Sequence, residues 1–334
     1  MNSASTKKRS DAIDMVKGLS IITLFFLHLE NGYLNLEYNY FIVRSPAFYI
    51  VVGWLWGLSK NRRTVKEHWV KRLQGLVKPY IYFSLIFLAF DIIIIILQLK
   101  PPFILYRDLY KTFCLRGIGT LWFLPALLGG EIIFLYLRTK IMKIKILSTM
   151  AIIALLYLVS EGLKSDITYI DIISAPMKVI KDTCFAYIFI CIAYFVSRRW
   201  GKRILNIKKQ YLFTIGTLLL ATSFCYANFI YIDRILDYIL NGVLAGLGIL
   251  LFFTAIENFK PISTPLVYCG KNSLTIMAVH YGILFETARI IDKHLFGYET
   301  YIGERTIIYF FVAAILQILI IEFINRKIPF IIGK

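Results

Sequence analysis

The chain has 334 residues, of which 58% are hydrophobic and only 17% are charged, and its mean hydropathy is +0.69. Windows of about 20 apolar residues, each long enough to cross a bilayer, recur along the whole chain, which excludes a soluble globular protein. These runs are continuous rather than alternating, which excludes a membrane β-barrel. The net charge of +18 comes from basic residues clustered in short loops on alternate sides of the apolar runs, and this distribution indicates membrane topology rather than nucleic-acid binding.

The predicted fold is an all-α integral membrane protein with about ten transmembrane helices and cytoplasmic N- and C-termini. The apolar runs predict helices over residues of about 12–29, 41–58, 79–99, 120–137, 146–163, 177–196, 211–228, 235–256, 266–290 and 305–324. They form a single transmembrane domain, residues 11–328, between a short basic cytoplasmic tail, 1–10, and a second cytoplasmic tail, 329–334. Because most Lys and Arg residues then face the cytoplasm, we expect a multi-pass protein of the cell (inner or cytoplasmic) membrane.

The first apolar run carries a fixed charge and a titratable ring, Lys17 and His28. At 100° per residue their separation is three turns plus about 20°, so both lie on one helix face, about 16 Å apart. Such groups inside a span usually face a protein interior and have a function there. Asp14 lies three residues before Lys17 and is placed to pair with it, and a neutral His28 is a candidate general base. A snorkelling lysine and a packing histidine are the alternative interpretation.

Three later segments also place polar groups at or inside the apolar runs. The basic segment Lys60–Lys78 fits contact with anionic membrane lipid or, alternatively, with a phosphate group. Pro79 is expected to begin the third helix. Glu131 lies within a span and needs a cationic partner from a neighbouring helix. In the segment Gly270–Leu274, the candidates to cap the ninth helix are Asn272 and Ser273.

The cysteines give no sign of a disulfide framework. All five lack CxxC pairing and metal-ligand spacing, so we expect no metal site. Most fall in or near apolar spans, where a free cysteine behaves as a small hydrophobic residue. The first apolar run contains Lys17 and lacks a small-x-small cleavage site, so we expect it to remain as a membrane anchor.

Taken together, five segments in this order resemble the acyltransferase-3 family of integral membrane acyltransferases, which includes polysaccharide O-acetylases. The resemblance covers residues from about 9 to 325. The family's opening motif has an aspartate, a basic residue, often a glycine, and a histidine after ten intervening residues; the matching residues are Asp14, Lys17, Gly18 and His28. The P-x-F-x-x-x-S-G-Y motif is matched by Pro46, Phe48 and Gly53, with Val52 and Trp54 in place of the serine and the tyrosine.

The other three motifs lie further along the chain. A basic pair followed by Pro-Tyr is matched by Lys71, Arg72, Pro79 and Tyr80, but Gln74 and Gly75 stand where a second arginine is often found. The W-F-L-P-A-L and G-K-N-S-L…H motifs are matched by Trp122–Leu127, Gly270–Leu274 and His280. The interpretation of His280 as a packing histidine, rather than a catalyst, is open at this point.

The resemblance implies an acyl-CoA donor, with acetyl-CoA favoured over succinyl-CoA, and a sugar hydroxyl of a surface polysaccharide or lipid-linked glycan as acceptor. It implies catalytic roles for His28, Asp14 and Lys17. The residues implied for donor binding are Lys17, Arg62, Arg63, Lys71, Arg72 and Trp122. The residues implied for acceptor binding are Glu131, Asn272, Ser273 and His280. No metal and no nucleic-acid partner is implied, and homo-oligomerisation is left open.

Two other classes of membrane protein compete with this interpretation. A lipid-linked sugar flippase or another transporter would use intramembrane acids as substrate contacts, namely Asp91, Glu131, Asp182 and Asp237. A polysaccharide polymerase or ligase would need a large outer loop rich in Arg and His, whereas the longest expected outer loop, Lys100–Gly119, contains no histidine. We expect this loop and the outer segments 30–40 and 291–304 to shape the choice of acceptor.

Overall fold

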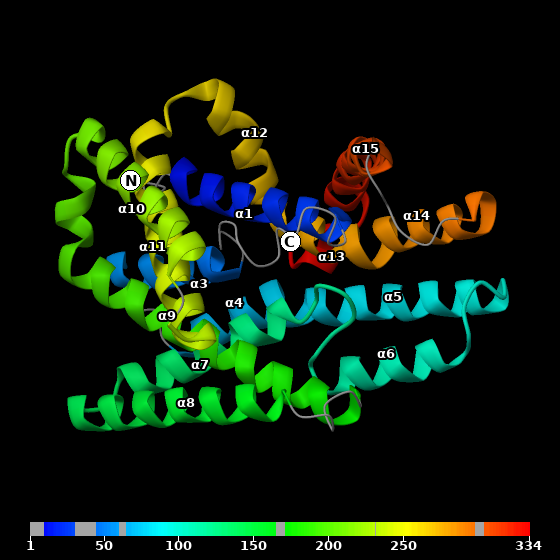
Figure 1. Ribbon diagram of the computed structural model, residues 1–334, viewed down its shortest axis with the longest axis horizontal. Helices are drawn as coiled ribbons and strands as arrows, with labels where there is room; N and C mark the ends of the chain where they lie inside the picture. Colours follow the sequence, from blue (N-terminus) through cyan, green and yellow to red (C-terminus); the bar gives the residue numbers. More distant parts are fainter. Residues whose placement is uncertain (1–9, 31–44, 60–64, 165–170, 231, 298–303) are drawn as a thin grey trace, which may run out of the picture.

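The structure is a computed structural model that describes residues 10–30, 45–59, 65–164, 171–230, 232–297 and 304–334. These residues form helices joined by short links, and no strand occurs among them (Figure 1). Within these described ranges, seven segments are long and apolar enough to cross a membrane: Trp69–Ile96, Met142–Gly162, Ile172–Leu205, Lys209–Phe229, Arg234–Ile256, Ser273–His294 and Ile308–Lys327. The all-helical, multi-pass prediction is therefore confirmed, whereas the total of about ten spans and the cytoplasmic termini stay predictions.

In the first half of the chain, the described residues form seven α-helices and one π-helical segment, η1. Their bounds are α1 (Asp11–Glu30), α3 (Ser45–Leu58), α4 (Val65–Arg72), η1 (Leu73–Val77), α5 (Lys78–Ile96), α6 (Phe103–Phe113), α7 (Phe123–Arg138) and α8 (Met142–Gly162). The helices α1, α3 and α7 lie outside the set of seven long apolar segments, although the sequence predicted spans there.

In the second half, the described residues include the 35-residue helix α9 and two further π-helical segments, η3 and η4. Its elements are α9 (Asp171–Leu205), α10 (Lys209–Phe229), α11 (Arg234–Ile256), α12 (Lys260–Lys271), α13 (Ser273–Val279), η3 (His280–Phe285), α14 (Glu286–Ile291), η4 (Asp292–Phe296), α15 (Glu304–Lys327) and the 3₁₀ turn η5 (Pro329–Ile332). This last turn lies in the predicted tail, where it buries Ile331 and Ile332.

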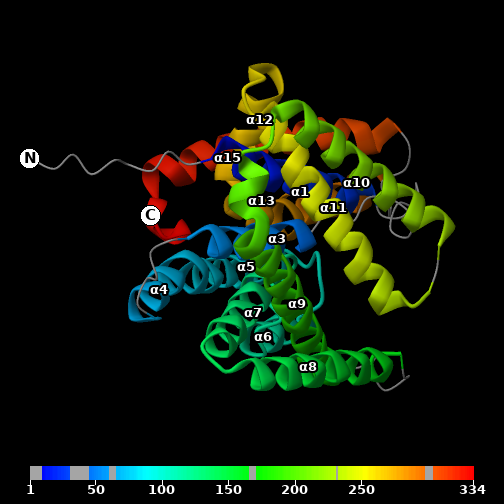
Figure 2. The ribbon, with the colours of Figure 1, turned by 90° about the vertical axis from the view of Figure 1, so that its left-hand side faces the viewer.

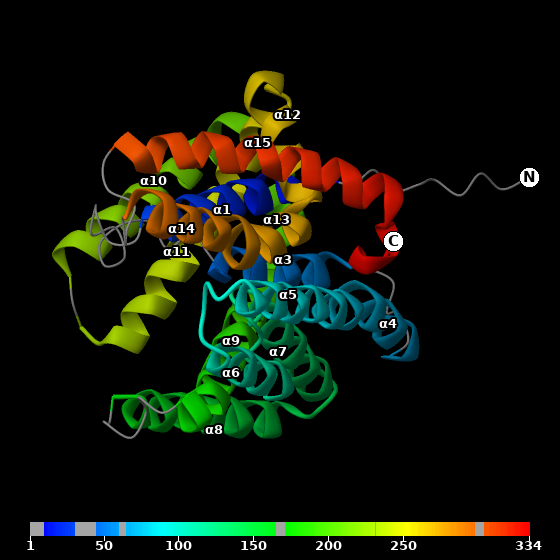
Figure 3. The same cartoon turned by 90° about the vertical axis from the view of Figure 1, so that its right-hand side faces the viewer.

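The helix α1 occupies the middle of the molecule. It contacts α12, α11, α3, α13 and α15, so elements from both ends of the chain surround it. The helix α12 lies on one side of α1, and α7 and α8 lie on the opposite side, in all three views (Figures 1, 2 and 3). The long α9 joins these parts, because it contacts α7 and α8 as well as α3 and α11 (Figure 2).

The expected start of the third helix is wrong. Helical structure runs from Val65 to Ile96, and Pro79 lies inside it rather than at its beginning. The π segment η1 ends two residues before this proline, and the Lys78 amide bonds back to the Leu73 carbonyl, five residues away. Because proline has no amide hydrogen and its ring crowds the preceding turn, a wider turn there lets the helix continue through it.

Two other expectations about helices also need correction. The predicted outer loop Lys100–Gly119 contains an eleven-residue helix, α6. The predicted helix 266–290 is broken at Asn272, where α12 ends and α13 begins. The amphipathic α12 is not one of the seven long apolar segments, so the span of the ninth helix begins at Ser273.

Candidate active site

The helix α1 is continuous from Asp11 to Glu30, which places Lys17 and His28 on one rod as expected. Lys17 Nζ lies 2.9 Å from Asp14 Oδ1, so the predicted ion pair is confirmed. The Asp14 side chain is fully buried, whereas the Lys17 side chain is 21% exposed. The lysine charge therefore lies where solvent can reach it, while its carboxylate partner is held inside the protein.

Two glycines let α12 pack directly on the backbone of α1. A Cβ added at Gly270 would lie 1.8 Å from the carbonyl oxygen of Asp14, and one added at Gly18 would lie 2.0 Å from the carbonyl oxygen of Leu266. Only residues without side chains permit so close an approach. The Gly270–Leu274 motif is therefore adjacent to the Asp14–Lys17 pair, although more than 250 residues separate them in the sequence.

The two motif histidines meet inside the protein. His28 Nδ1 lies 2.9 Å from His280 Nε2, and the rings are nearly parallel, with centroids 5.1 Å apart and an interplanar angle of 18°. His280 has no exposed surface, and its Nδ1 lies 2.7 Å from the carbonyl oxygen of Ile276. A carbonyl only accepts hydrogen bonds, so His280 Nδ1 carries a hydrogen.

This geometry fixes the tautomers of the neutral pair. With its hydrogen on Nδ1, a neutral His280 accepts at Nε2, and the hydrogen of the shared contact belongs to His28 Nδ1. The lone pair of His28 is then on Nε2. The contact with His280 therefore decides which His28 nitrogen carries the hydrogen and which carries the lone pair.

Aromatic rings enclose the histidine pair. Phe25 stacks on His280 with ring centroids 5.6 Å apart, Phe285 meets the same ring edge-on at 5.6 Å, and Tyr281 lies 4.9 Å from the His28 ring. His280 is also the first residue of the π segment η3. Such single-turn π segments occur frequently at functional sites, because they turn side chains out of the ordinary helical register.

A charged cluster at the ends of α5 and α14 adjoins Tyr281. The Arg289 guanidinium lies 5.5 Å above the Tyr281 ring and 3.6 Å from the carboxylate of Glu286, which also pairs with Lys100. Burial lowers the pKa of Lys100 below its usual value. This cluster extends polar contacts from the histidine pair toward the segment predicted to be the outer loop.

The segment before α7 also contacts the histidine helix. The Thr120 hydroxyl donates to the carbonyl of Met277, and a Cβ at Gly119, whose φ is +57°, would lie 3.1 Å from the Tyr281 ring. Trp122, predicted to bind the donor, is half-buried, with the Arg116 guanidinium 5.4 Å above its ring. Arg116 itself pairs with Asp182 at 2.7 Å. The structure thus groups Trp122 with Arg116 rather than with Arg72.

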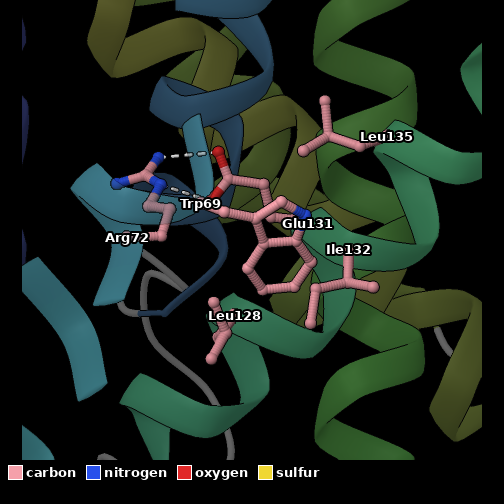
Figure 4. A pocket seen from close by; sticks show the side chains of 6 residues that line it. All are labelled: Trp69, Arg72, Leu128, Glu131, Ile132 and Leu135. Atoms are coloured by element: carbon pink, nitrogen blue, oxygen red, sulfur yellow. Dashed lines mark hydrogen bonds and ion pairs between the residues drawn. The ribbon is translucent and has the colours of Figure 1, made fainter. Parts of the chain in front are cut away.

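Arg72 and Glu131 form a second buried cluster (Figure 4). Arg72 Nε lies 2.6 Å from Glu131 Oε2, and its Nη2 donates to Oε1 over 2.7 Å. The Trp56 indole also donates to Oε1, over 2.8 Å. Arg72 is therefore the expected cationic partner of Glu131, whose side chain is only 1% exposed. The pocket beside them, lined by Trp69 and Leu128 among others, has no room for a water molecule.

The remaining predicted residues are scattered. Lys71 is exposed on α4, and Ser273 is half-buried at the start of α13. Asn272 stands at the N-cap of α13, but its side chain does not cap the helix: it donates to the Tyr268 carbonyl over 3.0 Å and accepts from Asn325 over 2.9 Å. The predicted cap is therefore wrong. Arg62 and Arg63 lie outside the described residues.

Sequence reasoning missed several groups of both clusters. The carbonyl of Ile276 lies one helical turn before His280, a spacing that was available in the sequence. Tyr281 and Phe25 are neighbours of the motif histidines but look like ordinary apolar residues. Nothing in the sequence points to Trp56 as a partner of Glu131.

Comparison with protein families shows to which family the chain belongs. The Acyltransferase domain model of the acyltransferase-3 family matches residues 10–324, nearly the whole chain. The chain belongs to the acyltransferase-3 family. Comparisons with curated proteins and with solved structures give no match. Family and apolar helices together make this acyltransferase-3 protein a multi-pass membrane acyltransferase.

Proposed function

We propose that this chain is a membrane-embedded O-acetyltransferase of the cell membrane. It moves an acetyl group from cytoplasmic acetyl-CoA to a sugar hydroxyl of a cell-surface polysaccharide or its lipid-linked precursor. The observation that carries the proposal is the His28–His280 contact, 2.9 Å long, which leaves a basic nitrogen on the same helix as the partly exposed Lys17. A base inside the protein and a cation near its surface are what transfer from a charged donor to a hydroxyl requires.

The residues of the pair have separate roles in this reaction. His28 Nε2 takes the proton from the sugar hydroxyl, whose oxygen forms a bond to the acyl carbon. The carbon–sulfur bond of the thioester breaks, and the same proton passes to the departing thiolate. His280 accepts the hydrogen bond from His28 Nδ1 throughout, which holds the ring in place and stabilises the imidazolium while it exists.

The donor end of the site is proposed at the start of α1. Bound acetyl-CoA would supply the acetyl group as a thioester with a thiolate leaving group. Lys17 stands about 16 Å below His28 along the helix, so a long thioester arm along this face would connect a phosphate-bearing head to the base. Asp14 holds the Lys17 ammonium in position through their ion pair.

The contacts of the intramembrane acids support the acyltransferase over a transporter. Acids that a transporter would use have protein partners here: Glu131 binds Arg72, Asp182 binds Arg116, and Asp237 accepts from the Tyr226 hydroxyl over 2.6 Å. These contacts satisfy the acids within the protein. A transport pathway would instead need them directed toward a substrate.

The test uses protein purified in nanodiscs and acetyl-CoA labelled in the acetyl group. Label is followed into a panel of surface glycans and, as donor hydrolysis, into free acetate. Transfer by the wild type that is lost in His28→Ala, with thermal stabilisation by acetyl-CoA retained, is expected. Absence of both stabilisation and label transfer with acetyl-CoA and succinyl-CoA would overturn the proposal and favour the transporter.

A further inference from the structure

A hollow opens beside the start of α1, on the side away from the Arg72 cluster. Its volume is about 310 Å³, and its walls come from α1 and α12. The lining residues are Asp11, Lys260, Ser263, Thr264, Val267, Tyr268 and Lys271. The helix α12 lies on one side of α1 and α7, which carries Glu131, on the other (Figures 1 and 3). The hollow and the Arg72–Glu131 cluster are therefore separate places.

The polar groups of the hollow favour an anion. The lining contains two lysines, Lys260 and Lys271, and one carboxylate, Asp11, which lies 3.7 Å from the Lys260 ammonium. Tyr268 adds no negative charge, because burial raises the pKa of its hydroxyl above the usual value. The lining thus carries an excess of positive charge, and both lysine side chains belong to exposed residues that an incoming ligand can reach.

The side chain of Ser263 points to a ligand independently of the two lysines. Its residue is only 1% exposed, yet its hydroxyl oxygen has no hydrogen-bond partner among the described residues. A buried hydroxyl without a partner costs free energy, so such groups are uncommon unless a ligand or water satisfies them. Ser263 is one of the residues that line the hollow and lies between Lys260 and Lys271 in the sequence of α12, which makes its hydroxyl the candidate donor to an oxygen of a bound group.

The wall of the hollow is rigid where it meets the active-site helix. The contacts of Gly18 with Leu266 and of Gly270 with Asp14 hold α12 against α1 at backbone distance. Lys271 follows Gly270 directly, and Asp14 binds Lys17. A ligand in the hollow is therefore held at the same end of α1 as Lys17.

We propose that this hollow is a phosphate-binding site, with Lys260 and Lys271 as its cations and Ser263 as its hydroxyl donor. The ligand class is a phosphate mono- or diester, which matches two ammonium groups and one hydroxyl. Two sources share this chemistry: the phosphates of the coenzyme A head and the headgroup of an anionic lipid. The second is relevant because Phe259 and Ile262 of the same region expose apolar side chains.

If the phosphates belong to the coenzyme A head, the site is part of the proposed acetyltransferase function and rests on it. It assigns the donor's phosphates to α12 rather than to Arg72, which is engaged by Glu131 in a pocket without room for water. The phosphate site does not require that acyl transfer occurs. Binding of a phosphate compound and transfer of an acetyl group are therefore measured separately.

The test measures binding of 3′,5′-adenosine bisphosphate and coenzyme A to the protein in zwitterionic nanodiscs. A parallel arm measures thermal stabilisation by phosphatidylglycerol over phosphatidylcholine. The variants are Ser263→Ala and the double variant Lys260→Ala/Lys271→Ala. Matched controls are Ser160→Ala, a buried hydroxyl also without a partner among the described residues, and Lys209→Ala, whose ammonium is likewise 3.7 Å from a carboxylate.

We expect each lost contact to weaken phosphate binding roughly tenfold, because hydrogen bonds to charged groups are stronger than those between neutral groups.

Ser263→Ala should also raise the melting temperature slightly, because it removes a buried hydroxyl that has no hydrogen-bond partner among the described residues. A serine with only a structural role would not show both this rise and weaker phosphate binding. If the α12 variants bind the nucleotides more weakly, the ligand is the head of coenzyme A. If these variants lose only the stabilisation by phosphatidylglycerol, the ligand is an anionic lipid. Unchanged behaviour of the folded double variant in both arms overturns the site.

Failure of the site and failure of the proposed function give different results. If His28→Ala and wild type bind coenzyme A equally through α12 but neither transfers acetyl to any glycan, the phosphate site stands and the acetyltransferase proposal fails. If transfer occurs and depends on His28 while the α12 variants bind normally, the acetyltransferase proposal stands and the phosphate site fails.

Discussion

The two partly buried polar clusters of this protein differ in the chemistry of the groups that they bring together. In the Arg72–Glu131 cluster, the carboxylate receives hydrogen bonds from a guanidinium and from the Trp56 indole, and the space beside it excludes water. In the histidine pair, two titratable rings share one hydrogen bond and leave a nitrogen with a lone pair. The first arrangement pairs a carboxylate with a guanidinium, while the second pairs the two rings that the proposed function uses as the base and its partner.

The largest expected effect tests the histidine pair directly. Replacing His28 by Ala removes the base, so acetyl transfer should fall by about 10²–10⁴-fold, the usual contribution of general-base catalysis. Labelled acetyl transfer to glycan measures this, with His294→Ala as the control because His294 is exposed on η4. Transfer that persists in a correctly folded His28→Ala protein would make both histidines packing residues.

The next effect tests whether the Arg72 cluster serves the fold. Glu131→Ala leaves a partly buried guanidinium without its carboxylate and should cost about 3 kcal/mol of unfolding free energy. Removing both charges, with Arg72→Met/Glu131→Met, should cost less than the single change, because no unpaired charge is left. Reversible unfolding in mixed detergent micelles measures both. A stable Arg72→Met/Glu131→Met protein that has lost coenzyme A binding would instead assign Arg72 to the donor.

A smaller effect separates positioning from catalysis within the histidine pair. His280→Leu removes the acceptor for His28 Nδ1 at similar side-chain volume. We expect kcat to fall roughly tenfold to a hundredfold with KM little changed, as when a residue that orients a functional histidine through its other ring nitrogen is lost. His280→Gln keeps an acceptor and should recover part of the rate. The pH profile of kcat/KM should move in the Leu variant, whereas a packing role alone would leave the profile in place.

The smallest effect tests one hydrogen bond of the Arg72 cluster. Trp56→Phe removes the indole donor to Glu131 but keeps a ring beneath the Arg138 guanidinium, which lies 4.8 Å from the indole centroid. We expect a loss of about 1–2 kcal/mol in unfolding free energy and unchanged acetyl transfer. Trp200→Phe, at a residue that is 43% exposed, is the control. Equal losses in the two variants would show that the bond to Glu131 contributes nothing measurable.

The difference between local and distant contacts explains what the sequence could predict. The Asp14–Lys17 pair and the shared face of Lys17 and His28 follow from helical periodicity alone, and the structure has both. The contact between His28 and His280 spans 252 positions, so no spacing rule finds it. The partner of Glu131 was predicted by type, a cation from another helix, but not by position, because several basic residues were equally suitable.

The predictions of helix boundaries were wrong where a residue's own preference competes with the surrounding structure. Pro79 is a favourable first-turn residue, but the wider turn of η1 allows the helix to pass through it. Asn272 is a favourable N-cap, and it occupies that position, but Tyr268 and Asn325 take its side chain. In both cases the surrounding structure, rather than the residue's own preference, decides which bonds are made.

The π segment that begins at His280 bears on how the sequence of this protein can change. A π segment holds one more residue per turn than an α-helix, so a single inserted or deleted codon converts one into the other. Such a change in η3 would rotate everything after it by about 100° while α13 and His280 stay against His28. Glu286 and Arg289, which lie beyond η3 near Tyr281, would then face different neighbours. One-residue length changes at this point thus give evolution a way to alter the charged end of the site without rebuilding its histidine pair.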